Sequence, residues 1–367
     1  MNITFDEDFS HGVNIKVIGV GGGGGNALNC MVTSGIKDVE YISVNTDDRA
    51  LRQSKATQRI QIGAKLTKGR GAGNKPEVGE RSAQENREEI SAALKGANMV
   101  FITAGMGGGT GTGAAPVVAE IAQELGVLTV GVVTKPFRFE REQKMTQAER
   151  GIDELSKHVD ALVVIPNERL LVGSEKPLTM KESFTLSDDV LWKAVKSISD
   201  LVQIDGYINL DFADVETIMR NAGYAHMAMG SGTGKNKAEE AANAVISSPL
   251  LETSIAGAGK ILANLIISED VLSEDVAKLS DMITEAAQSD AEIIIGTAFD
   301  DTLEDTMQIT VIATCFKDMP LNAKAGAVVE DTPKEEQPQE ENKTGATSLL
   351  DNDDSFAQIM RLFKDKT

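Results

Sequence analysis

The sequence is poor in the residues on which disulfide-bonded, nucleic-acid-binding and membrane-anchored proteins depend. Only 2 of its 367 residues are cysteine, and Cys30 and Cys315 lie far apart, each in an apolar stretch. This usage argues against a disulfide or metal-ligand framework and fits a reducing cytoplasm. Basic residues are also scarce, because 36 Lys and Arg face 56 Asp and Glu, for a net charge of −20. Nucleic acids and anionic membranes both favour basic surfaces, so neither is expected as the main partner.

Long hydrophobic runs are missing as well. No apolar run approaches the roughly 18–20 residues of a membrane-spanning helix, and the acidic start MNITFDED lacks the apolar core of a signal peptide. We therefore expect a cytoplasmic protein without direct membrane insertion. A composition of 41% hydrophobic and 25% charged residues is that of a globular protein. The length predicts roughly two domains.

Glycine is concentrated in one segment, Gly105–Gly113 (GMGGGTGTG), in which six of the nine residues are glycine. The segment lies between the apolar run Met99–Thr103 and the Ala-rich stretch Ala114–Leu125, which has helical character. Glycine has no Cβ, so such a loop can turn successive amide N–H groups into one concavity. The following helix adds its unpaired first-turn N–H groups and the positive end of its dipole. The segment therefore predicts an anion site, most naturally for phosphate, supported by amides and a bound Mg²⁺.

A second glycine run follows the first predicted strand. Val13–Val20 is a β-branched run that leads directly into Gly21–Gly25, and Asn26 is the expected start of a helix. Gly19–Gly24 fits the pattern G-x-G-x-x-G of dinucleotide-binding folds, although a run of five glycines matches many such patterns. Further strands are expected to alternate with helices at Val39–Val44, Met99–Thr103, Leu128–Val133 and Ala161–Ile165, with a helix at Glu142–Ser156.

This alternation predicts an α/β protein with a Rossmann-like parallel sheet. Ligands of such sheets bind at the carboxyl ends of the strands. Both glycine segments and the polar cluster Asn45–Asp47 lie at such ends, so we expect them to converge on one nucleotide. Gly69–Gly73 opens a further loop, with Pro76 at a plausible helix start.

The pattern changes at Leu178–Gln203, where apolar residues recur at helical spacing without glycine or proline. A helix of this length, ~37 Å at 1.5 Å per residue, is expected to join two domains. The residues after it predict a smaller, mixed α/β C-terminal domain. Within that domain Gly230–Lys235 (GSGTGK) is reminiscent of a P-loop, but Met229 stands where the motif needs glycine and Asn236 where it needs Ser or Thr. We therefore reject a second phosphate site.

An acidic, proline-containing segment follows residue 318 and predicts a disordered tail, because it cannot bury enough apolar surface to fold. The last residues differ, since Phe356, Ile359, Met360 and Phe363 recur at helical spacing. We expect a disordered linker over 318–354 and a short helix over 355–367 that docks on a partner. The alternative is a helix that packs against its own domain.

Several segments together resemble the tubulin signature as the FtsZ family of bacterial cell-division proteins carries it. The resemblance covers residues of about 12–316 and rests on VIGVGGGGGNA (17–27), GMGGGTGTGAAPVV (105–118), TKPFRFE (134–140), NLDFADV (209–215) and SSPLL (247–251). It implies a GTPase that polymerises head to tail into protofilaments and forms the division ring at mid-cell. The implied parts are a GTP-binding domain (12–177), a central helix (178–203) and a C-terminal domain (204–317).

The resemblance also assigns a nucleotide site for GTP or GDP with Mg²⁺. The two phosphate loops match Gly22, Gly23, Gly24, Gly25 and Asn26, and Gly108, Gly109, Thr110, Gly111 and Thr112. Glu140 matches the acid that contacts the ribose. Lys144 stands where many members have an arginine against the nucleotide, so the charge is kept and bidentate hydrogen bonding is lost.

Phe184 and Asp188, which are one helical turn apart, match the residues of the family that contact the guanine. Phe184 matches the ring that stacks on the base. A carboxylate at Asp188 can accept hydrogen bonds from both N1–H and the exocyclic amino group of guanine, a pattern that adenine lacks. The alternative for Asp188 is a solvated helix residue.

The catalytic loop of the family matches Asn209, Asp211 and Asp214. In the family this loop enters the nucleotide site of the next subunit, so hydrolysis depends on assembly. Two carboxylates beside an amide can orient and polarise an attacking water, although an isolated D-x-x-D at a helix start is more often a cap.

Two other functions compete with this interpretation. One is an NAD- or FAD-dependent oxidoreductase, suggested by Gly19–Gly24 with Glu40 as the ribose acid; it leaves the second glycine segment unexplained. The other is a nucleotide-binding scaffold without catalysis, in which Asp211 and Asp214 only cap a helix. The tail lacks the usual Ile-Pro-Ala-Phe-Leu-Arg core, so a division-ring adaptor or regulator other than the ordinary membrane-tethering ones is expected to bind it.

Overall fold

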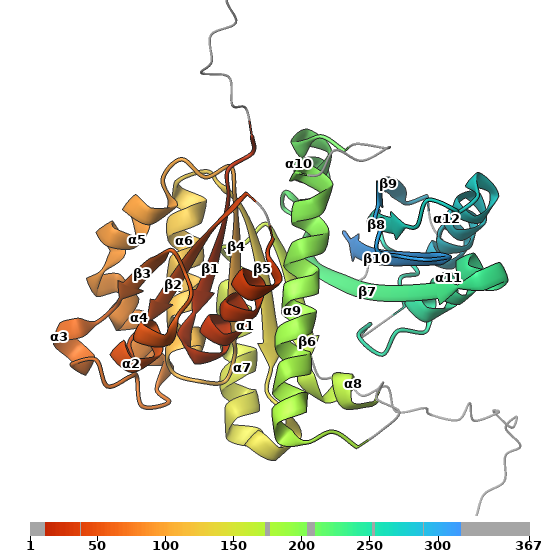
Figure 1. Ribbon diagram of the computed structural model, residues 1–367. Coiled ribbons are helices and arrows are strands. Elements are labelled where there is room, and N and C mark those ends of the chain that lie inside the picture. Colours follow the sequence, from red (N-terminus) through yellow and green to blue (C-terminus); the bar gives the residue numbers. More distant parts are fainter. Residues whose placement is uncertain are drawn as a thin grey trace, which may run out of the picture. The chain divides into compact units, whose positions relative to one another are not determined.

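The computed structural model, shown in Figure 1, describes residues 12–36, 38–172, 177–203, 210–251, 254–288 and 290–316. The predicted linker 318–354, the predicted tail helix 355–367 and the predicted catalytic residue Asn209 lie outside these ranges. Among the helices described, none combines the length and the apolar character that crossing a bilayer requires.

A parallel sheet forms the N-terminal half, as the alternation of strands and helices predicts. Its strands lie in the order β3-β2-β1-β4-β5-β6, and each neighbouring pair is parallel. The strands are β1 (Ile15–Val20), β2 (Val39–Asn45), β3 (Gln58–Gln61), β4 (Met99–Gly105), β5 (Leu128–Lys135) and β6 (Ala161–Pro166). Strand β3 was not predicted from the sequence, because its four residues include a single buried side chain.

Helices cover both faces of this sheet (Figure 1). The helices of this half are α1 (Gly21–Ser34), α2 (Asp48–Gln53), α3 (Ala64–Thr67), α4 (Pro76–Glu85), α5 (Arg87–Leu94), α6 (Thr110–Glu124), α7 (Glu142–Leu155) and α8 (Asn167–Val172). Successive residues of a strand point to opposite faces, and the cores follow this rule. In β4, Met99 and Phe101 pack with α1 and α9 (Met180–Gln203), whereas Val100 and Ile102 pack with α4, α5, α6 and α7.

The two glycine segments differ from the prediction, because helix α1 takes up the whole of the first and α6 takes up the end of the second, from Thr110 to Gly113. The sequence predicts a loop at Gly21–Gly25 and a helix from Asn26, but α1 begins at Gly21. Likewise α6 begins at Thr110 rather than in the Ala-rich stretch. Close packing is the reason: a Cβ on Gly24 would lie 2.2 Å from the carbonyl oxygen of Thr103. These glycines therefore let the first turns of the helices lie directly on the strands.

The helix α9 has 24 residues, which confirms the predicted long central helix. After it the sheet continues as β6-β7-β10-β8-β9, in which β10 is antiparallel to both of its neighbours and β8 is parallel to β9. This mixed sheet confirms the predicted fold class. The elements are α10 (Phe212–Met219), β7 (Gly223–Thr233), α11 (Lys237–Ile246), β8 (Lys260–Ile267), α12 (Ser273–Ala287), β9 (Glu292–Phe299) and β10 (Thr306–Thr314).

The P-loop-like segment GSGTGK runs along β7 and into a short 3₁₀ turn, η2 (Gly234–Asn236). A Cβ on Gly230 would lie 2.1 Å from the carbonyl oxygen of Ala241, and one on Gly232 would lie 2.0 Å from that of Lys237. These glycines are thus required by the packing of α11 on β7. This supports the rejection of a second phosphate site.

Candidate nucleotide-binding site

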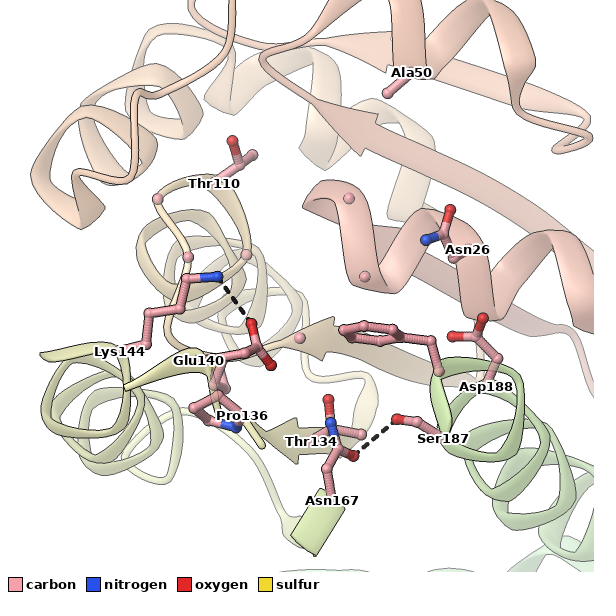
Figure 2. A pocket seen from close by; sticks show the side chains of 18 of the residues that line it. Asn26, Ala50, Thr110, Thr134, Pro136, Glu140, Lys144, Asn167, Ser187 and Asp188 are labelled. Atoms are coloured by element: carbon pink, nitrogen blue, oxygen red, sulfur yellow. Dashed lines mark hydrogen bonds and ion pairs between the residues drawn. The ribbon is translucent and has the colours of Figure 1, made fainter. Parts of the chain in front are cut away.

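A cleft of about 420 Å³ lies at the carboxyl ends of the parallel strands, where ligands of such sheets bind. Two helix N-termini, the segment before α7 and the N-terminal part of α9 form its walls (Figure 2). Of the predicted nucleotide-binding residues, the cleft is lined by Gly22, Gly23, Asn26, Gly108, Gly109, Thr110, Gly111, Glu140, Lys144, Phe184 and Asp188. Residues far apart in the sequence therefore meet in one cavity.

The phosphate end is built where the N-termini of α1 and α6 abut. Gly21 has a φ of +74°, and a Cβ there would lie 2.7 Å from the backbone nitrogen of Gly111. Gly107 has a φ of +98°, with Lys144 O 2.7 Å from the position of its Cβ. Only glycine permits these approaches, so the two helices present first-turn N–H groups and positive dipole ends to the same cavity.

Three predicted residues lie behind the cleft rather than in its wall. Thr112 is buried, and its hydroxyl accepts a 2.8 Å hydrogen bond from the backbone N–H of Gly107. Gly24 contacts Thr103, and a Cβ on Gly25 would meet only the Ser43 hydroxyl, at 4.0 Å. Thr112 therefore fixes the shape of the glycine segment from the far side, and Gly24 allows α1 to approach β4, whereas a side chain at Gly25 would meet no close contact.

Thr110 is held by a second hydroxyl. Its Oγ1 lies 2.7 Å from Oγ1 of Thr46, which is fully buried at the end of β2. The backbone oxygen of Thr46 in turn accepts from the Thr67 hydroxyl and the Gly71 N–H. The loop after β2 and the loop before α4 are thereby tied to the first turn of α6.

Glu140 and Lys144 form an ion pair of 2.8 Å in the wall of the cleft, drawn as a dashed line in Figure 2. The other carboxylate oxygen of Glu140 accepts from the backbone N–H of Phe137, 3.1 Å away. Since Glu140 ends a short 3₁₀ turn, η1 (Arg138–Glu140), and Lys144 lies in the first turn of α7, local backbone geometry sets this pair.

The base end lies on α9. Phe184 is 41% exposed, and its ring meets Phe137 and Phe139 edge-on, at 5.2 and 6.2 Å between ring centroids. Asp188 is partly buried; burial, and then the neighbouring carboxylate of Asp189, raise its pKa from 3.8 to about 7. An aromatic face next to a carboxylate suits the recognition of a base that offers two adjacent donors.

Other lining residues were missed by the assignment from sequence. Thr134 and Asn167 stand at the carboxyl ends of β5 and β6, the signal that identified the cluster Asn45–Asp47. Ser187 donates a 2.8 Å hydrogen bond to Asn167 Oδ1 (Figure 2). It shares the face of α9 with Phe184 and Asp188, so helical spacing could have found it.

Asp211 and Asp214 do not line the cleft. Asp211 is the N-cap of α10, and its side chain accepts from the Asp214 N–H at 2.9 Å; the Asp214 side chain accepts in return from the Asp211 N–H at 3.2 Å. Phe184 and the end of α9 at Gln203 are separated by about 28 Å of helix, at 1.5 Å per residue. Figure 1 places α10 at this far end of α9.

Comparison with known families gives two matches. A model of the tubulin/FtsZ family GTPase domain matches residues 14–173, and a model of the FtsZ family C-terminal domain matches residues 223–317. An FtsZ dimer of M. jannaschii, solved empty, is 41% identical in sequence with a TM-score of 0.80. That match covers 84% of this chain and 90% of the archaeal one.

More distant structures share the fold. CetZ2 of Haloferax volcanii, solved as a GTPγS-bound protofilament, is 20% identical with a TM-score of 0.69, over 82% of this chain and 92% of that one. CetZ1 of the same organism, solved as a GDP-bound monomer, is 19% identical with a TM-score of 0.72. That match covers 84% of this chain and 96% of CetZ1.

Proposed function

Because this chain belongs to the FtsZ family, and is therefore a tubulin-like GTPase that forms protofilaments for cell division, we propose that its cleft binds GTP and is completed for hydrolysis by the next subunit. One observation carries the proposal. The cleft holds the groups that bind a nucleotide, whereas Asp211 and Asp214 lie beyond the opposite end of α9. A carboxylate at that end can reach a nucleotide only in a neighbouring subunit.

Each part of the nucleotide has a partner in the cleft. The first turns of α1 and α6, with Gly22, Gly23 and Gly108–Gly111, bind the phosphates through backbone N–H groups and dipoles. Glu140 and Lys144 bind the ribose region. Phe184 stacks on the guanine, and Asp188, with Asn26 and Asn167 nearby, reads its hydrogen-bonding edge.

A magnesium ion would be held mainly by the phosphates of the bound nucleotide. Among the described residues no group of three or more His, Cys, Asp or Glu side chains could hold a metal by itself. The phosphate side of the cleft offers oxygen donors on Asn45, Asp47 and Thr110, which suit a hard cation that retains several waters. When bound, the ion would neutralise charge that develops on the phosphates.

Hydrolysis needs a water held in line with the γ-phosphate. Asp211 is exposed, and Asp214 is partly so, at the start of α10. Their carboxylates, with the amide of Asn209, would orient and polarise this water in the cleft of the neighbour. Turnover would then depend on a filled interface between subunits.

The test is GTP hydrolysis as a function of protein concentration, with light scattering recorded in parallel. We expect almost no turnover below a threshold concentration and a rise with scattering above it. Asp211→Ala should assemble without turnover, a loss of about 10²-fold or more for a water-positioning group. Constant specific activity down to nanomolar protein would place the whole active site in one subunit and contradict the proposal.

Asp211→Ser is the matched control, because serine caps a helix as well as aspartate does but has no carboxylate. If Asp211 serves only as a cap, which is the scaffold hypothesis, this variant should keep the wild-type rate. We expect it to be as stable as the wild type and as inactive as Asp211→Ala. The GTPase family match decides against the oxidoreductase alternative.

Domain bounds of 12–177, 178–203 and 204–317 remain part of this proposal. The family matches at 14–173 and 223–317 and the unbroken helix α9 support them. We also propose that the tail 355–367 binds division-ring adaptors and that the polymer assembles at mid-cell; both rest on the sequence resemblance alone.

A further inference from the structure

The carboxylate of Glu140 receives one hydrogen-bond donor on each of its oxygens. Oε1 accepts from the backbone N–H of Phe137 at 3.1 Å, and Oε2 accepts from the Lys144 ammonium at 2.8 Å. A carboxylate oxygen accepts at two lone-pair sites. Each oxygen of Glu140 therefore retains one acceptor site, and the plane of the carboxylate is fixed by the two donors already present.

The Lys144–Glu140 pair differs from an ordinary surface ion pair. The Glu140 side chain is 18% exposed and that of Lys144 is 37% exposed, and both line the cleft. By contrast, Glu154 lies near the end of α7 and pairs with Lys157, which follows the helix. The N–O distance of this pair is similar, but the side chains of Lys157 and Glu154 are 55% and 59% exposed. Screening by water means that such exposed pairs contribute little to stability. The orientation of a partly buried carboxylate, in contrast, depends on the groups that donate hydrogen bonds to it.

The surrounding contacts place this carboxylate midway along the cleft. On one side the backbone oxygen of Lys144 lies against Gly107 of the phosphate-binding segment. On the other side Phe137, whose N–H donates to Glu140, packs edge-on against Phe184 at the base end. A group between the phosphate end and the base end of a nucleotide site meets the sugar.

We propose that Lys144 is a positioning residue for Glu140 and thereby sets the preference of this site for a ribose over a deoxyribose. The ammonium and the Phe137 N–H fix the carboxylate so that its two remaining acceptor sites receive the vicinal 2′- and 3′-hydroxyls. This inference rests on the proposed function, in which Glu140 contacts the ribose. In this inference Lys144 acts on the nucleotide through Glu140, which contacts the sugar, and not by binding the phosphates.

The experiment compares the affinities of GTP and 2′,3′-dideoxy-GTP, measured by titration at protein concentrations that give no light scattering. The variants are Lys144→Met, Lys144→Arg and the control Lys157→Met, which removes the exposed lysine outside the cleft. We expect Lys144→Met to reduce the preference for GTP over the dideoxy nucleotide about tenfold, the usual scale for a charged hydrogen bond. The affinity for the dideoxy nucleotide should fall much less than the affinity for GTP.

Rescue distinguishes positioning from a general structural effect. Lys144→Arg retains a charged donor for Glu140 and should keep most of the sugar preference, and Lys157→Met should keep all of it. In a Glu140→Gln background, Lys144→Met should cause no further loss of preference. An equal loss of affinity for both nucleotides in Lys144→Met would identify a direct phosphate contact and overturn the inference.

A wild-type protein without sugar preference would overturn the inference together with the ribose assignment of Glu140. It would leave the proposal of hydrolysis at subunit interfaces untouched, since the Asp211 experiment judges that proposal independently.

Discussion

Asp188 is a carboxylic acid in surroundings that favour its neutral form. It is partly buried in the wall of the cleft, beside a second carboxylate at Asp189 that accepts a weak 3.6 Å hydrogen bond from the Cys30 thiol. Burial and the charge of Asp189 raise the pKa of Asp188 from 3.8 to about 7. Such a shift is common where a titratable group contacts a ligand. Guanine offers two donors to the ionised carboxylate, so binding and deprotonation of Asp188 are linked.

We predict that GTP affinity rises with pH through the window around 7. Below the raised pKa the carboxyl carries a proton and cannot accept from both guanine donors, so affinity should fall by up to about tenfold per pH unit. Titrations from pH 5.5 to 8 under non-assembling conditions measure this. Asp188→Asn should bind GTP weakly and show a flat profile; an unchanged slope in that variant would mean that another group titrates.

The raised pKa of Asp188 also makes the stability of the folded protein depend on pH, but stability falls as the pH rises, whereas GTP affinity rises. The folded protein holds the Asp188 proton up to about pH 7, whereas the unfolded chain releases it near 3.8. Ionisation of Asp188 therefore opposes folding, and its contribution to stability declines as the pH rises from about 4 to 7.

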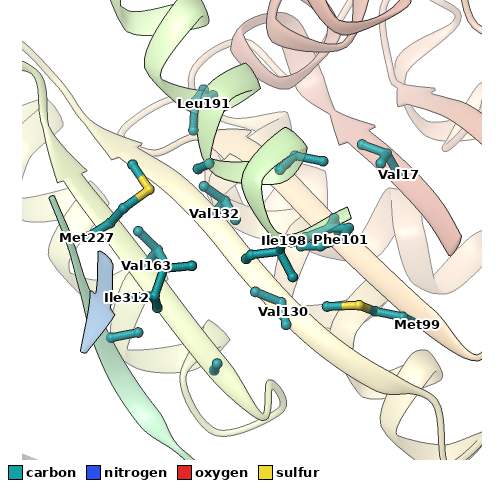
Figure 3. Close-up of a cluster of buried hydrophobic side chains, with 14 of the residues drawn as sticks. Val17, Met99, Phe101, Val130, Val132, Val163, Leu191, Ile198, Met227 and Ile312 are labelled. Atoms are coloured by element: carbon teal, nitrogen blue, oxygen red, sulfur yellow. The ribbon is translucent and has the colours of Figure 1, made fainter. Parts of the chain in front are cut away.

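At the scale of elements, the first turn of α1 is all glycine and that of α6 contains Gly111 and Gly113, so that the two helices can approach both the strands and each other. Figure 3 shows side chains of β1, β4, β5 and β6 facing α9, with Met227 of β7 and Ile312 of β10 in the same cluster. One face of helix α9 thus packs on the parallel sheet, and the same hydrophobic core includes residues of the C-terminal strands.

We predict that neighbouring glycines of α1 differ sharply in their tolerance of alanine. Gly24→Ala places a Cβ against the Thr103 carbonyl, which neither backbone can avoid, and should lower the free energy of unfolding by about 1–3 kcal/mol. Gly22→Ala meets no atom within 4 Å and should not lower it. Thermal unfolding of the two variants without nucleotide measures the contrast. Equal stabilities would contradict the close packing of α1 on β4.

At the scale of the whole molecule, α8 connects the cleft to the C-terminal half. Its first residue, Asn167, lines the cleft and accepts from Ser187. Two residues later, Arg169 donates to the backbone oxygens of Pro249, at 3.3 Å, and of Leu251. A short helix therefore joins a group in the nucleotide site to the loop after α11, parallel to the longer connection through α9.

We predict that Arg169→Met separates nucleotide binding from assembly. The substitution leaves two carbonyl oxygens without a charged donor and loosens the C-terminal half from α8. Monomer affinity for GTP should change by less than about twofold, whereas the protein concentration at the assembly threshold should rise several-fold. Binding titrations and light scattering measure these two quantities. A matched loss in both would mean that Arg169 acts within the nucleotide site itself.

The sequence alone determined the fold class, the long helix α9 and most of the cleft. Alternating β-branched strands and helical segments predict a parallel sheet, and a parallel sheet brings the carboxyl ends of its strands together. The two glycine segments and the cluster Asn45–Asp47 could therefore be assigned to one site before their distances were known. The family resemblance added Glu140, Phe184 and Asp188, because no local pattern links these residues to glycine loops that lie tens of positions earlier in the chain.

Tertiary structure alone decided which residues face the ligand and which support it. Thr110 and Thr112 look equivalent in sequence, yet one lines the cleft and the other is buried behind it, since two residues along a helix turn a side chain by about 200°. The pairing of Lys144 with Glu140 depends on the η1 turn before α7. The distance from the cleft to Asp211 follows from the straight course of α9. Orientation and reach are properties of packed elements, which composition and spacing do not encode.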